Sequence, residues 1–128
     1  MPHLKIGNSE IYYEEAGAGP ETIVFSHGLL MSTEMFREQI QALSNLYRCI
    51  AYDHRGQGRS EVSKSGYDMD SLTADAVEVI RQLDCAPCHF AGLSMGGFVG
   101  MRLAIHHPEL LKSLILMETT ADPEPEEN

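Results

Sequence analysis

The chain has 128 residues, and its shares of hydrophobic (43%) and charged (22%) residues are those of one globular domain, which excludes a disordered, collagen-like or coiled-coil protein. Nine basic against nineteen acidic residues leave a net charge of −10, which disfavours binding to nucleic acid or to anionic lipid. No apolar run approaches the roughly 18 residues of a membrane span and no secretion signal opens the sequence, so we expect a cytoplasmic protein without a membrane partner.

The N-terminal residues predict a β-hairpin. Residues 3–6 and 9–15 are short runs of strand-forming residues, and Gly7-Asn8 between them accepts the positive φ angles of a tight turn. Glycines and a proline end this pattern at residues 17–20. The apolar stretch 22–25 is then typical of a strand that is buried on both faces of a sheet.

A first helix is predicted after this strand. It follows a polar cap at Ser32 or Thr33, and its apolar residues Phe36, Ile40 and Leu43 fall at i, i+4 and i+7. This spacing places the three side chains on one helical face, which we expect to pack against the sheet.

The middle of the chain predicts a further strand, loop, helix and strand. Residues 47–52 form the strand, and residues 53–60 form a loop that contains two glycines. Between residues 72 and 83 apolar side chains recur at helical spacing more regularly than anywhere else in the chain. A short apolar strand at 89–93 follows.

The same alternation continues toward the C-terminus. A helix opens near Met95 and stops at Pro108, with His106 and His107 at its end, where a cation meets the helix dipole favourably. Residues 113–117 form another strand. Because strands and helices alternate from residue 22 onward, the sequence predicts an α/β fold: a mostly parallel, doubly wound sheet with helices on both faces and an N-terminal β-hairpin.

The segment Gly92-Leu93-Ser94-Met95-Gly96-Gly97 lies between a predicted strand and a predicted helix. A sharp turn at such a junction brings backbone segments close together, and glycine at 92 and 96 removes the Cβ atoms that would clash. Ser94 would then project from the carboxyl edge of the sheet, above the N-terminus of the next helix. The alternative is a glycine-rich helix start in which Ser94 serves only as an N-cap.

Two further segments carry motifs of the same kind. The strand at 22–25 continues into Ser26-His27-Gly28-Leu29, and the strand at 47–52 continues into Asp53–Ser60, which has the form D-x-R-G-x-G-x-S. With the G-x-S-x-G-G elbow following in order, residues 3–120 resemble the N-terminal half of an α/β-hydrolase of the esterase, lactonase and cofactor-free haloperoxidase type.

The resemblance implies a nucleophile and an oxyanion hole. Ser94 is the serine that attacks an acyl carbonyl to form an acyl-enzyme, and the backbone N–H groups of Leu29 and Met95 stabilise the tetrahedral oxygen. His27 is expected to brace its loop rather than to act as a base. No cofactor and no metal ion are expected at this site.

Other polar residues near these motifs are expected to be structural. Asp53 and Arg55 can make charge-assisted hydrogen bonds to the backbone or to each other, and Ser60 holds the same loop. Glu118, at the end of the strand 113–117, is placed to orient a histidine from elsewhere in the protein. A strand-end role is favoured for it, because the triad acid of most relatives follows a later strand.

The sequence Cys85-Ala86-Pro87-Cys88-His89 offers a competing interpretation. It has the C-x-x-C-H form of haem c attachment and the C-x-x-C of thiol redox enzymes, and together with Cys49 it raises the question of a zinc site. Haem attachment needs an exported chain, and a redox cysteine is favoured at a helix N-terminus, whereas this pair follows a helix and enters a strand. We therefore expect reduced thiols in a connecting loop, with one cysteine in the core.

The resemblance also implies that the chain is half of a hydrolase. In relatives the triad acid usually follows the seventh strand and the histidine follows the eighth, and six strands are predicted here. Residues 121–128, rich in Pro and Glu, resemble an acidic tail that leads toward a lid, beyond a catalytic part at 1–120. We expect the isolated chain to be almost inactive, and its last strand to pair with the missing half or with another copy.

These residues are compatible with three functions. A serine hydrolase of small carboxylic esters or lactones is favoured for the parent protein, a non-catalytic α/β-hydrolase scaffold used for binding is the alternative, and a redox or haem protein comes third. Serine as the nucleophile disfavours dehalogenase and epoxide-hydrolase chemistry, for which relatives use Asp, and dienelactone hydrolases, which use Cys. The substrate itself is not predicted, because the lid and later loops set it in this family.

Overall fold

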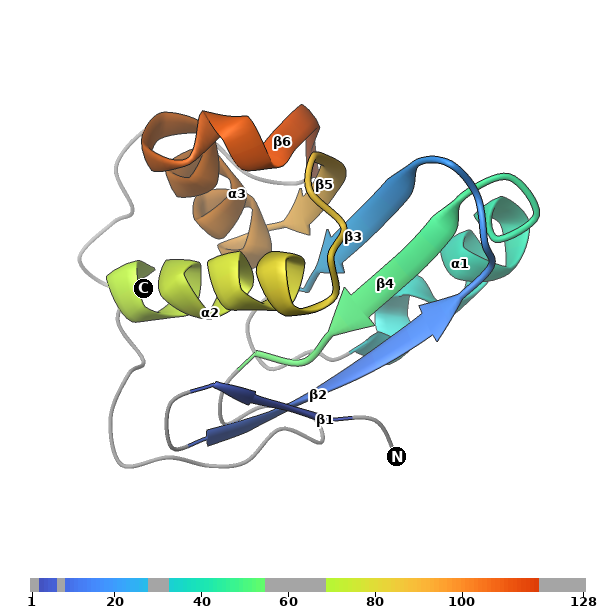
Figure 1. Ribbon diagram of the computed structural model, residues 1–128, viewed down its shortest axis with the longest axis horizontal. Coiled ribbons are helices and arrows are strands. Elements are labelled where there is room, and N and C mark those ends of the chain that lie inside the picture. The colour runs from blue at the N-terminus through green and yellow to red at the C-terminus, as the bar shows by residue number, and fades with distance from the viewer. Residues whose placement is uncertain (1–2, 7–8, 28–32, 55–68, 118–128) are drawn as a thin grey trace.

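The computed structural model describes residues 3–6, 9–27, 33–54 and 69–117 (Figure 1). The elements in chain order are β1 (His3–Ile6), β2 (Ser9–Ala16), β3 (Thr22–Ser26), the 3-10 helix η1 (Thr33–Phe36), α1 (Arg37–Leu43), β4 (Arg48–Tyr52), α2 (Met69–Gln82), β5 (Cys88–Leu93), α3 (Met95–His106), the 3-10 helix η2 (Pro108–Leu110) and β6 (Leu111–Met117). The predicted alternation of strands and helices is confirmed.

The strands form one sheet in the order β1-β2-β4-β3-β5-β6. Strand β2 runs antiparallel to both β1 and β4, and the pairs β4–β3, β3–β5 and β5–β6 are parallel. The mostly parallel sheet with an opening hairpin is therefore as predicted. Parallel strands end at a common edge, so the carboxyl ends of β3, β4, β5 and β6 lie together.

Helices cover both faces of the sheet (Figure 1). On one face α2 and α3 pack against a large core, and on the other η1 and α1 cover a smaller one. Alternate residues of each strand point to opposite faces, so Val24 belongs to the larger core and Ile23 and Phe25 to the smaller. Strands buried on both sides explain the unbroken apolar runs in the sequence.

Several elements begin or end at other residues than the sequence predicts, most clearly the first helix and β6. The first helix begins as the 3-10 turn η1, and α1 itself starts only at Arg37, after Phe36, which makes no side-chain cap. Helix α3 ends at His106, and Pro108 opens the short turn η2. Strand β6 consequently begins at Leu111, two residues earlier than predicted, because η2 delivers the chain directly to the sheet edge.

Strand β6 forms one edge of the sheet within the described residues. Its Ile115 and Leu116 are 45% and 42% exposed, although both are large and apolar. The proposed pairing of this edge with further polypeptide is not tested by the structure. None of the helices in the described ranges has the length and apolar content that crossing a bilayer requires.

Candidate active site

The junction of β5 and α3 is a strained turn centred on Ser94. Its backbone has φ 52° and ψ −111°, outside the ordinary regions for a residue with a side chain. The turn is fixed on both sides, since Ser94 N–H donates to the carbonyl of Met117 (3.0 Å) and Ser94 C=O accepts from Phe98 N–H (3.1 Å). Ser94 stands at the N-cap position, but its side chain makes no cap hydrogen bond. The interpretation of Ser94 as a plain helix cap is therefore not supported.

Close backbone approach explains the glycines on either side of Ser94. A Cβ atom on Gly92 would clash with the backbone of Gly96, and one on Gly96 would lie 2.6 Å from the carbonyl carbon of Ser26 and closer still to its oxygen. Backbone atoms cannot move aside as a flexible side chain can. Both glycines are buried while Ser94 is exposed, so the turn presents one hydroxyl-bearing residue at the carboxyl edge of the sheet.

A buried polar cluster lies beneath this turn. The Ser26 hydroxyl, at the end of β3, is 3.1 Å from the hydroxyl of Tyr52 at the end of β4 and 3.1 Å from Nε2 of His54. All three side chains are almost completely shielded from water. Buried polar groups persist in a core when they are hydrogen-bonded to one another. The cluster ties β3 to β4 directly below Gly96, which rests on Ser26.

His27 and His54 join the two segments that leave β3 and β4. The backbone N–H of His54 donates to Nε2 of His27 (2.8 Å), and Nε2 of His54 lies 3.0 Å from the carbonyl of His27. A carbonyl only accepts, so Nε2 of His54 carries the hydrogen, and Nε2 of His27 must be unprotonated. Within the described residues Nδ1 of His54 is buried without a hydrogen-bond partner. The predicted bracing role of His27 agrees with these contacts.

Burial sets the ionisation of this cluster. It lowers the pKa of His54 to about 3, with the nearby His27 as the second cause, and it raises the pKa of Tyr52. Asp53 is also buried, with Oδ1 4.0 Å from His27 Nε2. At neutral pH His54 is therefore uncharged, and its side chain stabilises the fold through hydrogen bonds rather than as a cation.

Several predicted site residues fall outside the described residues. These are Leu29, Arg55, Ser60 and Glu118. Met95 is described as the first residue of α3, where a backbone N–H has no acceptor within the helix. Sequence reasoning missed Ser26, Tyr52 and His54; the signal for them is that polar residues stand at or just beyond the carboxyl ends of two buried strands.

The cysteine motif lies apart from Ser94, where the chain enters β5. Cys85 and Cys88 are both buried, so the expectation of a single core cysteine was wrong. Cys85 lies in the segment between α2 and β5, Cys88 is the first residue of β5, and Cys85 Sγ donates to the carbonyl of Ile80 at 3.4 Å. A hydrogen bond between the thiols lowers the pKa of Cys85, and the same bond with burial raises that of Cys88. Across the described ranges no group of three His, Cys, Asp or Glu side chains is arranged to hold a metal ion.

Comparisons with known proteins identify the fold family. The family model of the alpha/beta hydrolase fold matches residues 21–128. The "Putative carbamate hydrolase RutD" of Azorhizobium caulinodans is 38% identical over 122 residues, which are 91% of this chain and 44% of that protein. The enol-lactonase of Burkholderia xenovorans LB400 superposes with a TM-score of 0.89 at 34% identity, covering 94% of this chain and 47% of its own.

A third relative extends the range of activities. The thermophilic esterase of Thermogutta terrifontis superposes with a TM-score of 0.91 at 28% identity, over 99% of this chain and 49% of its own. The chain thus spans less than half the length of the curated relatives that it matches.

Proposed function

Because the chain belongs to the α/β-hydrolase fold family, we propose that it carries the nucleophile of a serine hydrolase acting on small carboxylic esters or lactones. The nucleophile is Ser94. The observation that carries the proposal is its backbone, at φ 52° and ψ −111° in a strand-to-helix turn. Such strain costs of order 1–3 kcal/mol and gathers at functional sites, where the surrounding structure enforces it.

The proposed reaction proceeds through an acyl-enzyme. The Ser94 hydroxyl attacks the substrate carbonyl, its proton leaves to a base, and a tetrahedral intermediate forms. The Met95 N–H, together with that of Leu29, would donate to the developing oxyanion; one such donor is worth about 3–4 kcal/mol in other serine hydrolases. The alcohol then departs with a proton, and water releases the acid and regenerates Ser94.

The base in this proposal comes from neither buried histidine. His27 Nε2 accepts the backbone N–H of His54, and His54 Nε2 donates to the backbone of His27, so both are engaged in holding the fold. We assign the base and its carboxylate to the part of the relatives' length that this chain does not span, with the β6 edge as the place where that part joins. The chain alone would then hydrolyse esters poorly, because an unassisted serine is a weak nucleophile.

The names of three relatives support the substrate class. Two are named as an enol-lactonase and an esterase and a third as a "Putative carbamate hydrolase", and lactones, esters and carbamates all contain a carbonyl carbon bonded to an ester oxygen or to a heteroatom that hydrolysis replaces. The alternative is a non-catalytic scaffold that keeps the elbow without using it. The following experiment separates the two.

A fluorophosphonate probe at micromolar concentration tests the assignment in the full-length protein. We expect the phosphonate on the peptide that contains Ser94, and its complete loss in Ser94→Ala. Ser44→Ala is the matched control, because Ser44 also lies partly exposed but only donates to the carbonyl of Gln41 (3.5 Å), and it should label as the parent does. An unlabelled Ser94 in folded full-length protein would establish the scaffold instead.

A further inference from the structure

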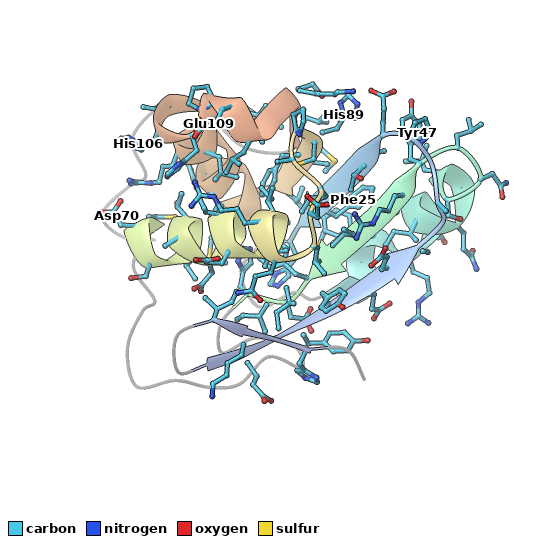
Figure 2. The ribbon with its side chains drawn as sticks, viewed as in Figure 1. Phe25, Tyr47, Asp70, His89, His106 and Glu109 are labelled. Carbon is cyan, nitrogen blue, oxygen red and sulfur yellow. The ribbon has the colours of Figure 1, made fainter. Side chains whose placement is uncertain are left out.

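A second hydroxyl, imidazole and carboxylate meet at the opposite edge of the sheet from Ser94. Glu21 directly precedes β3, His89 is the second residue of β5, and Ser113 is the third of β6. These are the amino ends of parallel strands, and His89 and Ser113 are direct partners in the β5–β6 register. Figure 2 shows His89 at this edge, close to Tyr47.

The three side chains are hydrogen-bonded in series. His89 Nδ1 lies 2.6 Å from the Ser113 hydroxyl, and His89 Nε2 lies 3.1 Å from Glu21 Oε1. An ionised carboxylate only accepts, so the hydrogen of the neutral imidazole is on Nε2. Nδ1 is then a lone pair that accepts the Ser113 O–H. The Glu21 carboxylate thus orients the His89 ring, and Nδ1 of that ring accepts a hydrogen bond from the Ser113 hydroxyl. A base hydrogen-bonded to a hydroxyl in this way activates the hydroxyl as a nucleophile.

Neighbouring side chains favour the ionised form of Glu21 and leave the Ser113 hydroxyl accessible. Lys112 Nζ lies 3.1 Å from the same Glu21 oxygen, and its hydrogen bond, followed by that of His89, holds the pKa of Glu21 below its ordinary value. The Tyr47 ring packs edge-on against His89, with centroids 6.2 Å apart. In the 128-residue chain Ser113 is exposed, and the His89 and Glu21 side chains are 23% and 39% exposed, so a small molecule can reach the hydroxyl there.

We propose that Ser113 is a second reactive serine, which accepts acyl groups from small activated esters with His89 as its general base and independently of Ser94. In the step, Ser113 Oγ bonds to the carbonyl carbon and its proton passes to His89 Nδ1. The bond from the carbonyl carbon to the aryl oxygen breaks, and the aryl oxide takes the proton from His89. The products are acyl-Ser113 and the free phenol. A positioned base accelerates such a transfer by about 10²–10⁴-fold.

The test treats the 128-residue chain carrying Ser94→Ala with p-nitrophenyl acetate. Because Ser94 is absent from this variant, the outcome does not depend on the function proposed for Ser94. Acetylation is followed by peptide mapping over time, and hydroxylamine removes serine esters but not lysine amides. We expect acetyl on Ser113 to form at least about tenfold faster than on Ser44, whose hydroxyl contacts only a backbone carbonyl.

Variants of His89 and Glu21 test whether His89 is the general base for Ser113. His89→Gln should lower acetylation of Ser113 to the rate of Ser44, and Glu21→Gln should lower it by a smaller factor, while urea unfolding verifies that both remain folded. Acetylation of Ser113 no faster than that of Ser44, an unchanged rate in folded His89→Gln, or hydroxylamine-resistant acetyl on Lys112 in place of Ser113 would each overturn the proposal.

Discussion

Replacing Gly96 by Ala tests whether the turn at Ser94 depends on direct contact between backbones. The added Cβ would lie 2.6 Å from the carbonyl carbon and 2.8 Å from the hydroxyl of Ser26, and closer to the carbonyl oxygen. Real Cβ atoms essentially never approach a heavy atom within 3.0 Å, so α3 or β3 must shift. The shift would also disturb Ser26, which holds Tyr52 and His54.

The expected cost follows from what the new atom meets. Overpacking a core costs typically about 1–3 kcal/mol, and the upper end applies here because the neighbour is backbone. Gly100→Ala is the matched control on the same helix. Its Cβ would meet Leu114 Cδ1 at 2.6 Å and Phe90 Cδ1 at 3.1 Å, both side-chain atoms. There the strain is offset by the roughly 1 kcal/mol of helix propensity that alanine gains over glycine in a helix interior.

Urea unfolding of the three proteins measures the difference. We expect Gly96→Ala to lose about 2–3 kcal/mol of unfolding free energy and Gly100→Ala to stay within about 1 kcal/mol of the parent. Fluorophosphonate labelling of Ser94 should fall in the first variant only. Equal unfolding free energies for the two variants would refute the reasoning, since it rests on the contrast between backbone and side-chain neighbours.

Three further predictions concern charge and hydrogen bonds. Burial and then His27 lower the pKa of His54 from 6.5 to about 3, so the unfolded chain takes up a proton below pH 6.5 that the folded chain refuses, and stability falls from there toward pH 3. His54→Gln should remove up to about 1.4 kcal/mol per pH unit of that decline in urea unfolding between pH 7 and pH 5, and equal slopes in the two proteins would contradict it. Tyr52→Phe leaves the buried Ser26 hydroxyl without one partner and should cost about 1–2 kcal/mol of unfolding free energy, whereas a change near zero would mean that the 3.1 Å contact contributes little. Asp70→Asn breaks an exposed ion pair with Arg102 (3.1 Å), and thermal unfolding should register less than about 1 kcal/mol; a larger loss would show that Asp70 does more than pair at the surface.

The sequence by itself determined the elements, their alternation and the turn at Ser94. Helical and strand periodicity are local properties, so the stripe that includes Leu72, Ala76 and Val79 identifies α2 without knowledge of its neighbours. The elbow is also local, because Gly92 and Gly96 lie within four residues of each other and record a steric requirement of one turn. Element ends were less well predicted, since η1 and η2 depend on how the chain meets the sheet.

Only the tertiary structure decided which polar side chains meet. Ser26 and His54 are 28 residues apart, and Glu21 and His89 are 68 apart, so their contacts depend on strand order and register, to which no local pattern refers. The sequence also did not reveal that Cys85 and Cys88 are both buried, because Cys85 lies in a connecting segment without a repeating geometry and Cys88 begins β5 one residue before the predicted strand. Local sterics therefore specify the turn at Ser94, whereas the buried hydrogen bonds among Ser26, Tyr52 and His54 and those that join Glu21, His89 and Ser113 arise from pairing between distant segments.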